Sequence, residues 1–179
     1  VSDRVPISVT AASVSYDDGA LELKFNWSAD KGTDEPMRIF AHFMDESGTI
    51  KFQGDHDSPQ ATTDWKGPIA TSRTVRLPES TRPGDTFALR VGLYDTATHR
   101  RALITGADSG ERNVLLGDLT LTGPDATVTG ITWTPIEHTT GSDPHLARLN
   151  PAEKAIGFDS VTTAGACRIA RDANGLTVT

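Results

Sequence analysis

The stretch "ALELKFNWSA", from Ala20 to Ala29, decides the fold class of this chain. Apolar side chains occupy every second position in it, and polar side chains occupy the positions between them. The large apolar members are Leu21, Leu23, Phe25 and Trp27. A period of two residues is typical of a β-strand with one buried face. The stretch therefore predicts a half-buried strand in a larger sheet.

The same alternation recurs along the first two thirds of the sequence. It is clearest in "MRIFAHFM" (residues 37–44), "TFALRVGLYD" (86–95) and "NVLLGDLTLTG" (113–123), with shorter strands expected near residues 50–52 and 71–77. Turn residues such as Gly, Pro and Asp separate these stretches, and no stretch has a sustained helical period. Many short strands with this spacing favour an all-β fold, an antiparallel two-sheet β-sandwich. Immunoglobulin-like and jelly-roll-like arrangements both stay open.

The amino-acid composition changes near Gly123, which suggests that the chain has three segments. Residues 1–122 are expected to form the β-sandwich module. Residues 123–150 are rich in Thr, Pro, Gly and Asp and read as a connecting segment, with Ile131 and Trp133 tucked against the sandwich. Residues 151–179 predict a short C-terminal β-hairpin extension that turns at Asp172–Gly175. Because the chain lacks an initial Met and ends within a predicted strand, we expect a larger parent protein.

Composition excludes several partner classes. The chain has 179 residues, a formal net charge of −7 and no concentrated run of Lys or Arg, which argues against nucleic acid as a partner. No apolar run approaches the roughly 20 residues that a membrane span requires. The single cysteine excludes an intrachain disulfide. These properties argue against nucleic acid and a membrane span and do not by themselves identify a partner.

The segment "FQGDHDSPQATTDW", residues 52–65, concentrates the residues that could carry chemistry. Asp55, His56 and Asp57 are candidate ligand-binding residues, and carboxylate oxygens suit Ca²⁺. Consecutive residues of an extended chain point to opposite sides, however, so the three converge only if the backbone turns. The alternative is that Asp and His bond the backbone of their own loop. The metal state of this segment therefore stays unknown from sequence, and we expect no cofactor.

Trp65 is the candidate aromatic platform for a sugar, since the apolar face of a pyranose stacks on a flat ring. Its position in a polar segment favours exposure, but a loop tryptophan also often covers one end of a sandwich. Both interpretations stay open. The sequence has no Gly-x-Ser-x-Gly and no His-Glu-x-x-His motif, so no catalytic residue is predicted.

Two stretches, "FAHFMDESGTIKFQGDHDSPQATTDWKGP" and "RPGDTFALRVGLYDTATHRRALI", together resemble a bacterial β-sandwich accessory module of uncertain function. Such modules occur in glycan-related envelope and secreted proteins, including the ends of membrane glycosyltransferases. The tail "AIGFDSVTTAGACRIARDANGLTVT" is similar to strand-rich ends of secreted glycoside hydrolases. The positions that match the recurring pattern are His42, Asp55, His56, Pro59, Trp65, Gly92, Leu93, Tyr94 and Asp95. Gln60 and Phe87 depart from it, where the pattern has a second proline and a tyrosine.

The resemblance implies an extracytoplasmic, non-catalytic accessory module of a bacterial protein that binds polysaccharide near Trp65, Asp55, His56 and Asp57. A purely structural module that positions a neighbouring domain is the first alternative. A glycan-active hydrolase, for which Asp55 and Asp57 supply the best carboxylates, is the second. The resemblance carries no established active site, and the segment 52–65 is interpreted first as a shaped crossover between strands.

Overall fold

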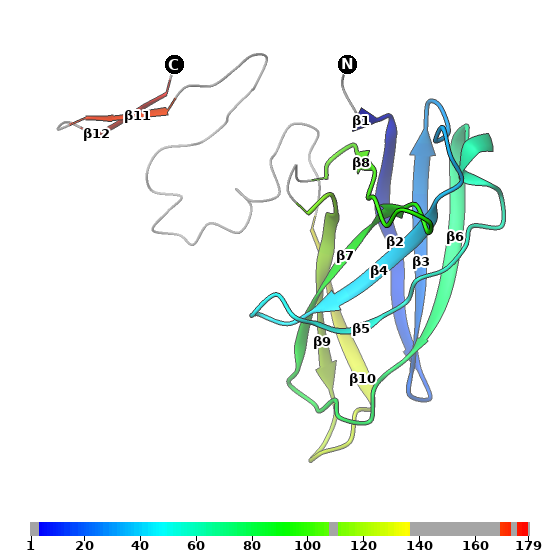
Figure 1. Cartoon of the computed structure of the whole chain (residues 1–179). Helices are drawn as coiled ribbons and strands as arrows, with labels where there is room; N and C mark the ends of the chain where they lie inside the picture. Colours follow the sequence, from blue (N-terminus) through cyan, green and yellow to red (C-terminus); the bar gives the residue numbers. More distant parts are fainter. Residues whose placement is uncertain (1–3, 108–110, 137–168, 173–174, 179) are drawn as a thin grey trace. The chain divides into compact units, whose positions relative to one another are not determined.

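The computed structural model describes residues 4–107, 111–136, 169–172 and 175–178 (Figure 1). The chain divides into two compact units, Val1–Glu137 and His138–Thr179. The second half of the connection expected at 123–150, the start of the extension, and the middle of the turn at 172–175 lie outside the described residues. No helix in the described part is long and apolar enough to cross a membrane.

Strands dominate the described residues of both units. The first unit contains β1 (Arg4–Val5), β2 (Ile7–Asp17), β3 (Ala20–Ala29), β4 (Arg38–Met44), β5 (Ile50–Gln53), the 3₁₀ turn η1 (Thr62–Asp64), β6 (Gly67–Arg76), β7 (Thr86–Tyr94), β8 (Leu103–Ile104), β9 (Val114–Thr122) and β10 (Gly130–Pro135). The second unit contains β11 (Ile169–Asp172) and β12 (Gly175–Val178), which pair antiparallel.

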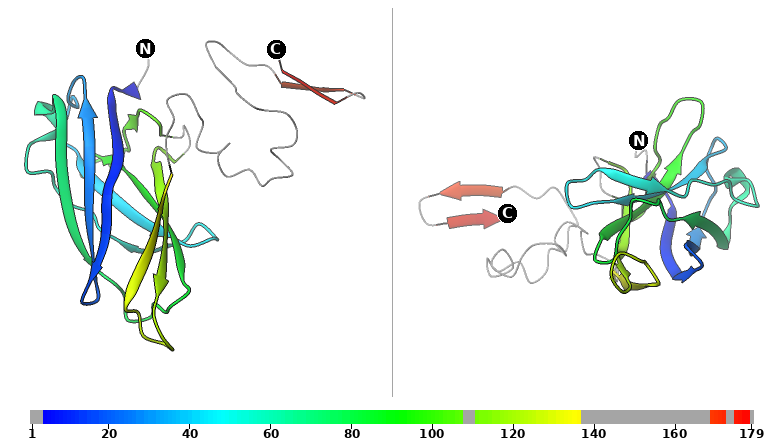
Figure 2. Two further views of the ribbon diagram at one scale, coloured as in Figure 1. Left: turned by 180° about the vertical axis from the view of Figure 1, so that it is seen from behind. Right: turned by 90° about the horizontal axis from the view of Figure 1, so that it is seen from below.

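Two antiparallel sheets make up the first unit. One has the strand order β2-β3-β6 and the other β10-β9-β7-β4-β5, while β1 and β8 form a small parallel pair. Figure 1 and the turned views in Figure 2 show the two main sheets as separate layers. The all-β prediction is confirmed, and the arrangement is that of a β-sandwich.

The strand quoted first is β3, with the predicted bounds and the predicted buried face. It begins after a two-residue turn in which Asp18 has φ 41° and Gly19 has φ 77°. Positive φ at both central residues is the geometry that a tight hairpin requires, and glycine adopts it without steric cost. The turn therefore fixes the register between β2 and β3.

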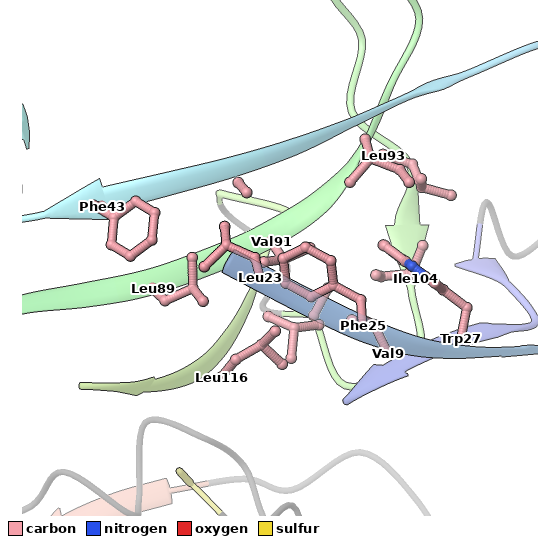
Figure 3. Close-up of a cluster of buried hydrophobic side chains, with 14 of the residues drawn as sticks. Val9, Leu23, Phe25, Trp27, Phe43, Leu89, Val91, Leu93, Ile104 and Leu116 are labelled. Atoms are coloured by element: carbon pink, nitrogen blue, oxygen red, sulfur yellow. The ribbon is translucent and has the colours of Figure 1, made fainter. Parts of the chain in front are cut away.

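The core lies between the two sheets (Figure 3). Leu23, Phe25 and Trp27 of β3 meet Leu89 and Val91 of β7 in a cluster of fully buried side chains. Burial of a large apolar side chain contributes about 1.5–3 kcal/mol relative to leaving it exposed. The alternation of apolar and polar residues in the sequence thus identifies the face of each strand whose burial stabilises the fold.

The sandwich continues beyond residue 122. The segment β10, within the expected connection, pairs with β9 along its whole length, with Ile131 opposite Leu121 and Trp133 opposite Leu119. Ile131 and Trp133 pack against the core as partly buried side chains. The compact unit that contains the sandwich accordingly runs to Glu137.

Candidate functional site

The three consecutive residues Asp55, His56 and Asp57 point in different directions. His56 Nδ1 lies 2.9 Å from the Gly54 carbonyl oxygen, and its ring stacks on Phe25 with 6.0 Å between centroids. Asp55 Oδ1 lies 3.5 Å from His42 Nε2, and Asp57 Oδ1 lies 3.5 Å from Arg38 Nε. Across the described part of the chain, no group of three or more His, Cys, Asp or Glu side chains is arranged to hold a metal ion.

The backbone of this segment is fastened to the edge of β4. The amide of His56 donates to the Ile39 carbonyl and the amide of Ile39 donates to the His56 carbonyl, each at 3.0 Å. The amide of Gly54 donates to the Ala41 carbonyl at 2.8 Å. The segment therefore continues the pairing of β5 with β4, and its side chains alternate between the core and the outer face of the sheet.

Trp65 lies in the core, with 1 % of its surface exposed. Its indole Nε1 donates to the Gln60 carbonyl at 3.1 Å, and its ring lies 5.2 Å from the ring of Trp27. A ring in this position has no open face on which a sugar could stack. The observed position is that of the covering tryptophan, the second of the two interpretations drawn from sequence, and ligand binding by Trp65 stays an untested prediction.

A different set of residues surrounds a hollow on the outer face of the five-stranded sheet, which we call the outer hollow. Its volume is about 270 Å³, and it is lined by Phe40, His42, Asp55, Tyr94, His99 and Arg101. Phe40 and His42 come from β4, where they alternate with the core residues Ile39, Ala41 and Phe43. Tyr94 ends β7, which is paired with β4. The lining residues on β4, on β7 and on the segment after β5 thus converge, because β4 lies next to both of the others.

Aromatic rings form the floor of the outer hollow. The ring of Phe40 lies 4.9 Å from that of His42 and 6.2 Å from that of Tyr94. The partner of Phe40 across the sheet is Gly92, and the absence of a side chain there leaves room for the Phe40 ring. The Arg101 guanidinium covers the same ring at 4.7 Å, a cation–π contact.

The Arg101 side chain is itself held in place. Its Nη1 donates to the Glu111 carbonyl at 2.8 Å and to Glu111 Oε2 at 3.2 Å. The Arg101 side chain keeps 30 % of its surface exposed. It therefore forms a polar wall of the outer hollow and covers Phe40, while Tyr94 is partly exposed.

Asp55 supplies the negative charge of the outer hollow. Burial opposes its ionisation, but the His42 hydrogen bond and charge, the Ala41 amide at 3.3 Å and the charge of Arg38 outweigh burial and lower the pKa of Asp55. Burial and the charge of Asp55 together raise the pKa of Tyr94. At neutral pH the hollow thus presents an ionised carboxylate beside a neutral phenol.

A second depression, of about 700 Å³, lies between the β4–β5 turn and the β6–β7 loop. It is lined by Asp45, Glu46, Ser47, Lys51, Pro78, Ser80, Thr81, Gly84, Asp85, Thr86 and Phe87. Phe87, its one aromatic residue, is buried, and the Asp45 carboxylate already bonds Ser47 and Thr49 of its own turn and Lys51 of β5. This depression offers little unsatisfied chemistry, so the outer hollow is the stronger candidate site.

Of the four site residues predicted from sequence, Asp55 alone lines the outer hollow. Sequence reasoning placed no ligand at Phe40, His42, Tyr94, His99 or Arg101. A signal for two of them was present, because His42 and Tyr94 belong to the recurring pattern together with Asp55. Searches for relatives bring no further indication, since no protein-family model matches the chain and no curated protein matches it.

Proposed function

We propose that this chain is a non-catalytic accessory module that binds a neutral polysaccharide through the outer hollow. The observation that carries the proposal is the convergence of Tyr94, Phe40, His42 and Asp55 on one open depression. Aromatic rings suit the apolar face of a sugar, and a carboxylate beside an imidazole suits its hydroxyl groups. The proposal keeps the polysaccharide partner predicted from sequence and moves its site.

The size of the outer hollow supports a monosaccharide unit as the part of the chain that is bound. Pockets for whole drug-sized ligands measure about 300–1,000 Å³. The outer hollow, at about 270 Å³, is slightly smaller and open to solvent. One sugar ring fits such a volume while its neighbours in the polymer remain outside.

The charge of Asp55 supports a neutral ligand. Its lowered pKa keeps the carboxylate ionised, so it accepts hydrogen bonds from hydroxyl groups and repels the carboxylate of a uronic acid. The nearby cations are already paired, Arg101 with Glu111 and Arg38 with Asp57. Neutral glucans, mannans or xylans are therefore favoured over pectin or alginate.

Binding is favoured over catalysis because of the number of carboxylates. Glycoside hydrolysis ordinarily uses two carboxyl groups on either side of the scissile bond. Among the described residues that line the outer hollow, Asp55 is the one that carries a carboxylate. Asp57 lies 3.5 Å from Arg38 instead, and its side chain is 81 % exposed.

The proposal includes two points that rest on the sequence. The finer fold class is immunoglobulin-like or jelly-roll-like, with the pair β11–β12 as the hairpin extension. The module belongs to a secreted or envelope protein of a bacterium, as the resemblance implies.

The test is calorimetric titration of the whole chain with soluble neutral polysaccharides, and with pectin and alginate for comparison. We expect a neutral polysaccharide to bind, and Asp55→Asn to weaken the affinity about tenfold or more, because a charged hydrogen-bond acceptor is lost. Asp57→Asn is the matched control and should bind like the wild type. Absence of binding to every polymer, or equal binding by the Asp55→Asn variant, would overturn the proposal.

A purely structural module is the second candidate, and one observation favours it. Asp55, His56 and Trp65 all bond the backbone of their own chain, at Ala41, Gly54 and Gln60. If that is their whole role, Asp55→Asn lowers the free energy of unfolding and no polysaccharide binds. Urea unfolding of the same variants therefore separates the two candidates.

A further inference from the structure

We propose that His56 is an acid-sensitive latch that holds Asp55 in the outer hollow. Above the latch's opening pH the neutral imidazole stays in the core; below it the ring is protonated, leaves the core and carries Asp55 away from His42. Any effect of this movement on ligand binding rests on the proposed function, whereas the movement of His56 and Asp55 does not.

The hydrogen bonding of His56 defines its protonation state. Nδ1 lies 2.9 Å from the Gly54 carbonyl oxygen, which only accepts, so Nδ1 carries the proton. Nε2 is then bare. It is fully buried and has no hydrogen-bond partner among the described residues. A proton added at Nε2 would create a buried cation with no acceptor, a state that is costly in an apolar interior.

Burial of the ring acts in the same direction. His56 is 5 % exposed and stacks on the core residue Phe25. The charged groups that act on it are Arg73 on β6, which opposes protonation, and Asp55 and Asp57 on its own segment, which favour it. Burial is the largest influence and outweighs the Gly54 hydrogen bond, which raises the pKa, so the pKa of His56 is lowered from its ordinary value of 6.5.

The sign of the pH dependence follows from that direction. A histidine whose pKa is lowered on folding binds fewer protons in the folded state than in the unfolded state. The buried position of the His56 ring is therefore favoured when the pH lies above the ordinary histidine pKa. This stabilisation is lost progressively as the pH falls below that value. Acid, and not alkali, opens the latch.

The latch is coupled to the outer hollow through one short piece of backbone. His56 shares two backbone hydrogen bonds with Ile39, and the neighbouring carboxylate of Asp55 accepts from the Ala41 amide. Gly54, on the other side, packs against Val75 so closely that an added Cβ would lie 2.5 Å from Val75 Cγ2. With Gly54 fixed, withdrawal of the His56 ring breaks the pairing with Ile39 and displaces Asp55.

The test uses imidazole ¹⁵N spectra and amide exchange of the whole chain, recorded as the pH is lowered from neutral. We expect His56 to be the neutral Nδ1–H tautomer at neutral pH. Its protonation should coincide with loss of protection at the Ile39 and His56 amides, while the β3 amides stay protected. Protonation of His56 with both amides still protected, or a neutral His56 until the whole domain unfolds, would overturn the latch.

A variant keeps the proposal falsifiable by a second route. His56→Phe retains a flat ring on Phe25 and cannot be protonated, so the Ile39 amide should stay protected at the pH that opens the wild type. His99→Gln, which removes an exposed histidine that lines the hollow, should open like the wild type. Should His56→Phe fold poorly, the wild-type spectra decide alone. If the His56 ring leaves the core in acid as expected but no polysaccharide binds at any pH, the proposed function is refuted and this inference stands.

Discussion

The indole ring of Trp65 packs on that of Trp27, with 5.2 Å between the ring centroids and an angle of 52° between the ring planes. Trp27 belongs to β3, whereas Trp65 follows η1 in the crossover from β5 to β6. The contact therefore fastens the crossover to the sheet that it leads into. Tilted aromatic pairs of this kind contribute about 0.5–1.5 kcal/mol beyond the area that they bury.

Trp65→Ala should destabilise the fold strongly, because it removes this contact and leaves a cavity in the core. Losses of about 3–5 kcal/mol are typical for such substitutions, and the free energy of unfolding in urea measures them. Lys66→Ala, at the exposed neighbouring position, is the control and should change stability little. A Trp65→Ala variant as stable as Lys66→Ala would show that the crossover does not depend on the ring.

The Thr62 hydroxyl organises the start of the same crossover. It accepts a hydrogen bond from the Met37 amide at 2.8 Å and lies 2.9 Å from the Thr33 hydroxyl oxygen, and Thr62 is 1 % exposed. Thr62→Val keeps the shape but leaves the Met37 amide without its acceptor, whereas the Thr33 hydroxyl still donates to the Glu35 carbonyl at 2.7 Å. We therefore expect a loss of about 1–3 kcal/mol in urea unfolding. Thr63→Val tests the neighbouring, partly exposed hydroxyl, and equal losses at the two positions would contradict this account.

Gly92→Ala should disturb the outer hollow directly. An added Cβ would lie 2.5 Å from Phe40 Cζ, so the ring has to move, at a cost of about 1–3 kcal/mol for overpacking. We expect shifted aromatic resonances of Phe40, His42 and Tyr94 in NMR spectra. Gly48→Ala, where open space surrounds the new methyl group and only the positive φ of 81° costs energy, should leave those resonances in place.

The Asp45 carboxylate makes the β4–β5 turn sensitive to acid. Hydrogen bonds from Ser47 and Lys51, and from the Thr49 amide, lower the pKa of Asp45 from its ordinary value of 3.8. A lowered carboxyl pKa contributes stability that is present above the ordinary value and is lost as the pH falls below it. The stability difference between wild type and Asp45→Asn should therefore shrink between about pH 5 and about pH 2.5.

Urea unfolding at several pH values checks that expectation. The neighbouring variant Glu46→Gln changes a carboxylate and leaves the bonds of Asp45 in place, so its difference from the wild type serves as the reference. A difference between wild type and Asp45→Asn that stays constant with pH would contradict the assignment.

The strands could be predicted from the sequence wherever one face of a strand is buried. In β3 and β7 the alternation marks each buried position, from Leu21 to Trp27 and from Phe87 to Leu93. In β2 and β10 it is weaker, because β2 mixes Ser and Thr with Val and β10 lies at a sheet edge with partly exposed residues. These two strands are held instead by their neighbours, because β2 pairs with β3 and β10 pairs with β9.

The candidate site could be predicted only in part, because it depends on which strands become neighbours. Asp55, His42 and Tyr94 are separated in sequence, and they meet on one face because β4 pairs with both β7 and the segment after β5. Trp65 illustrates a second reason why the site could be predicted only in part. Its polar sequence neighbours suggest exposure, but its contact with Trp27 is a tertiary one that no local pattern reveals.

The alternation of Asp55 and His56 constrains the length of a segment that otherwise resembles an ordinary loop. One residue inserted or deleted between Gln53 and His56 would exchange the two environments, placing a carboxylate in the core and the imidazole outside. After Asp57 the same change would fall in exposed chain at Pro59 and Gln60. Proteins that share this architecture should therefore differ in length downstream of Asp57 and hold a constant spacing from Gln53 to His56.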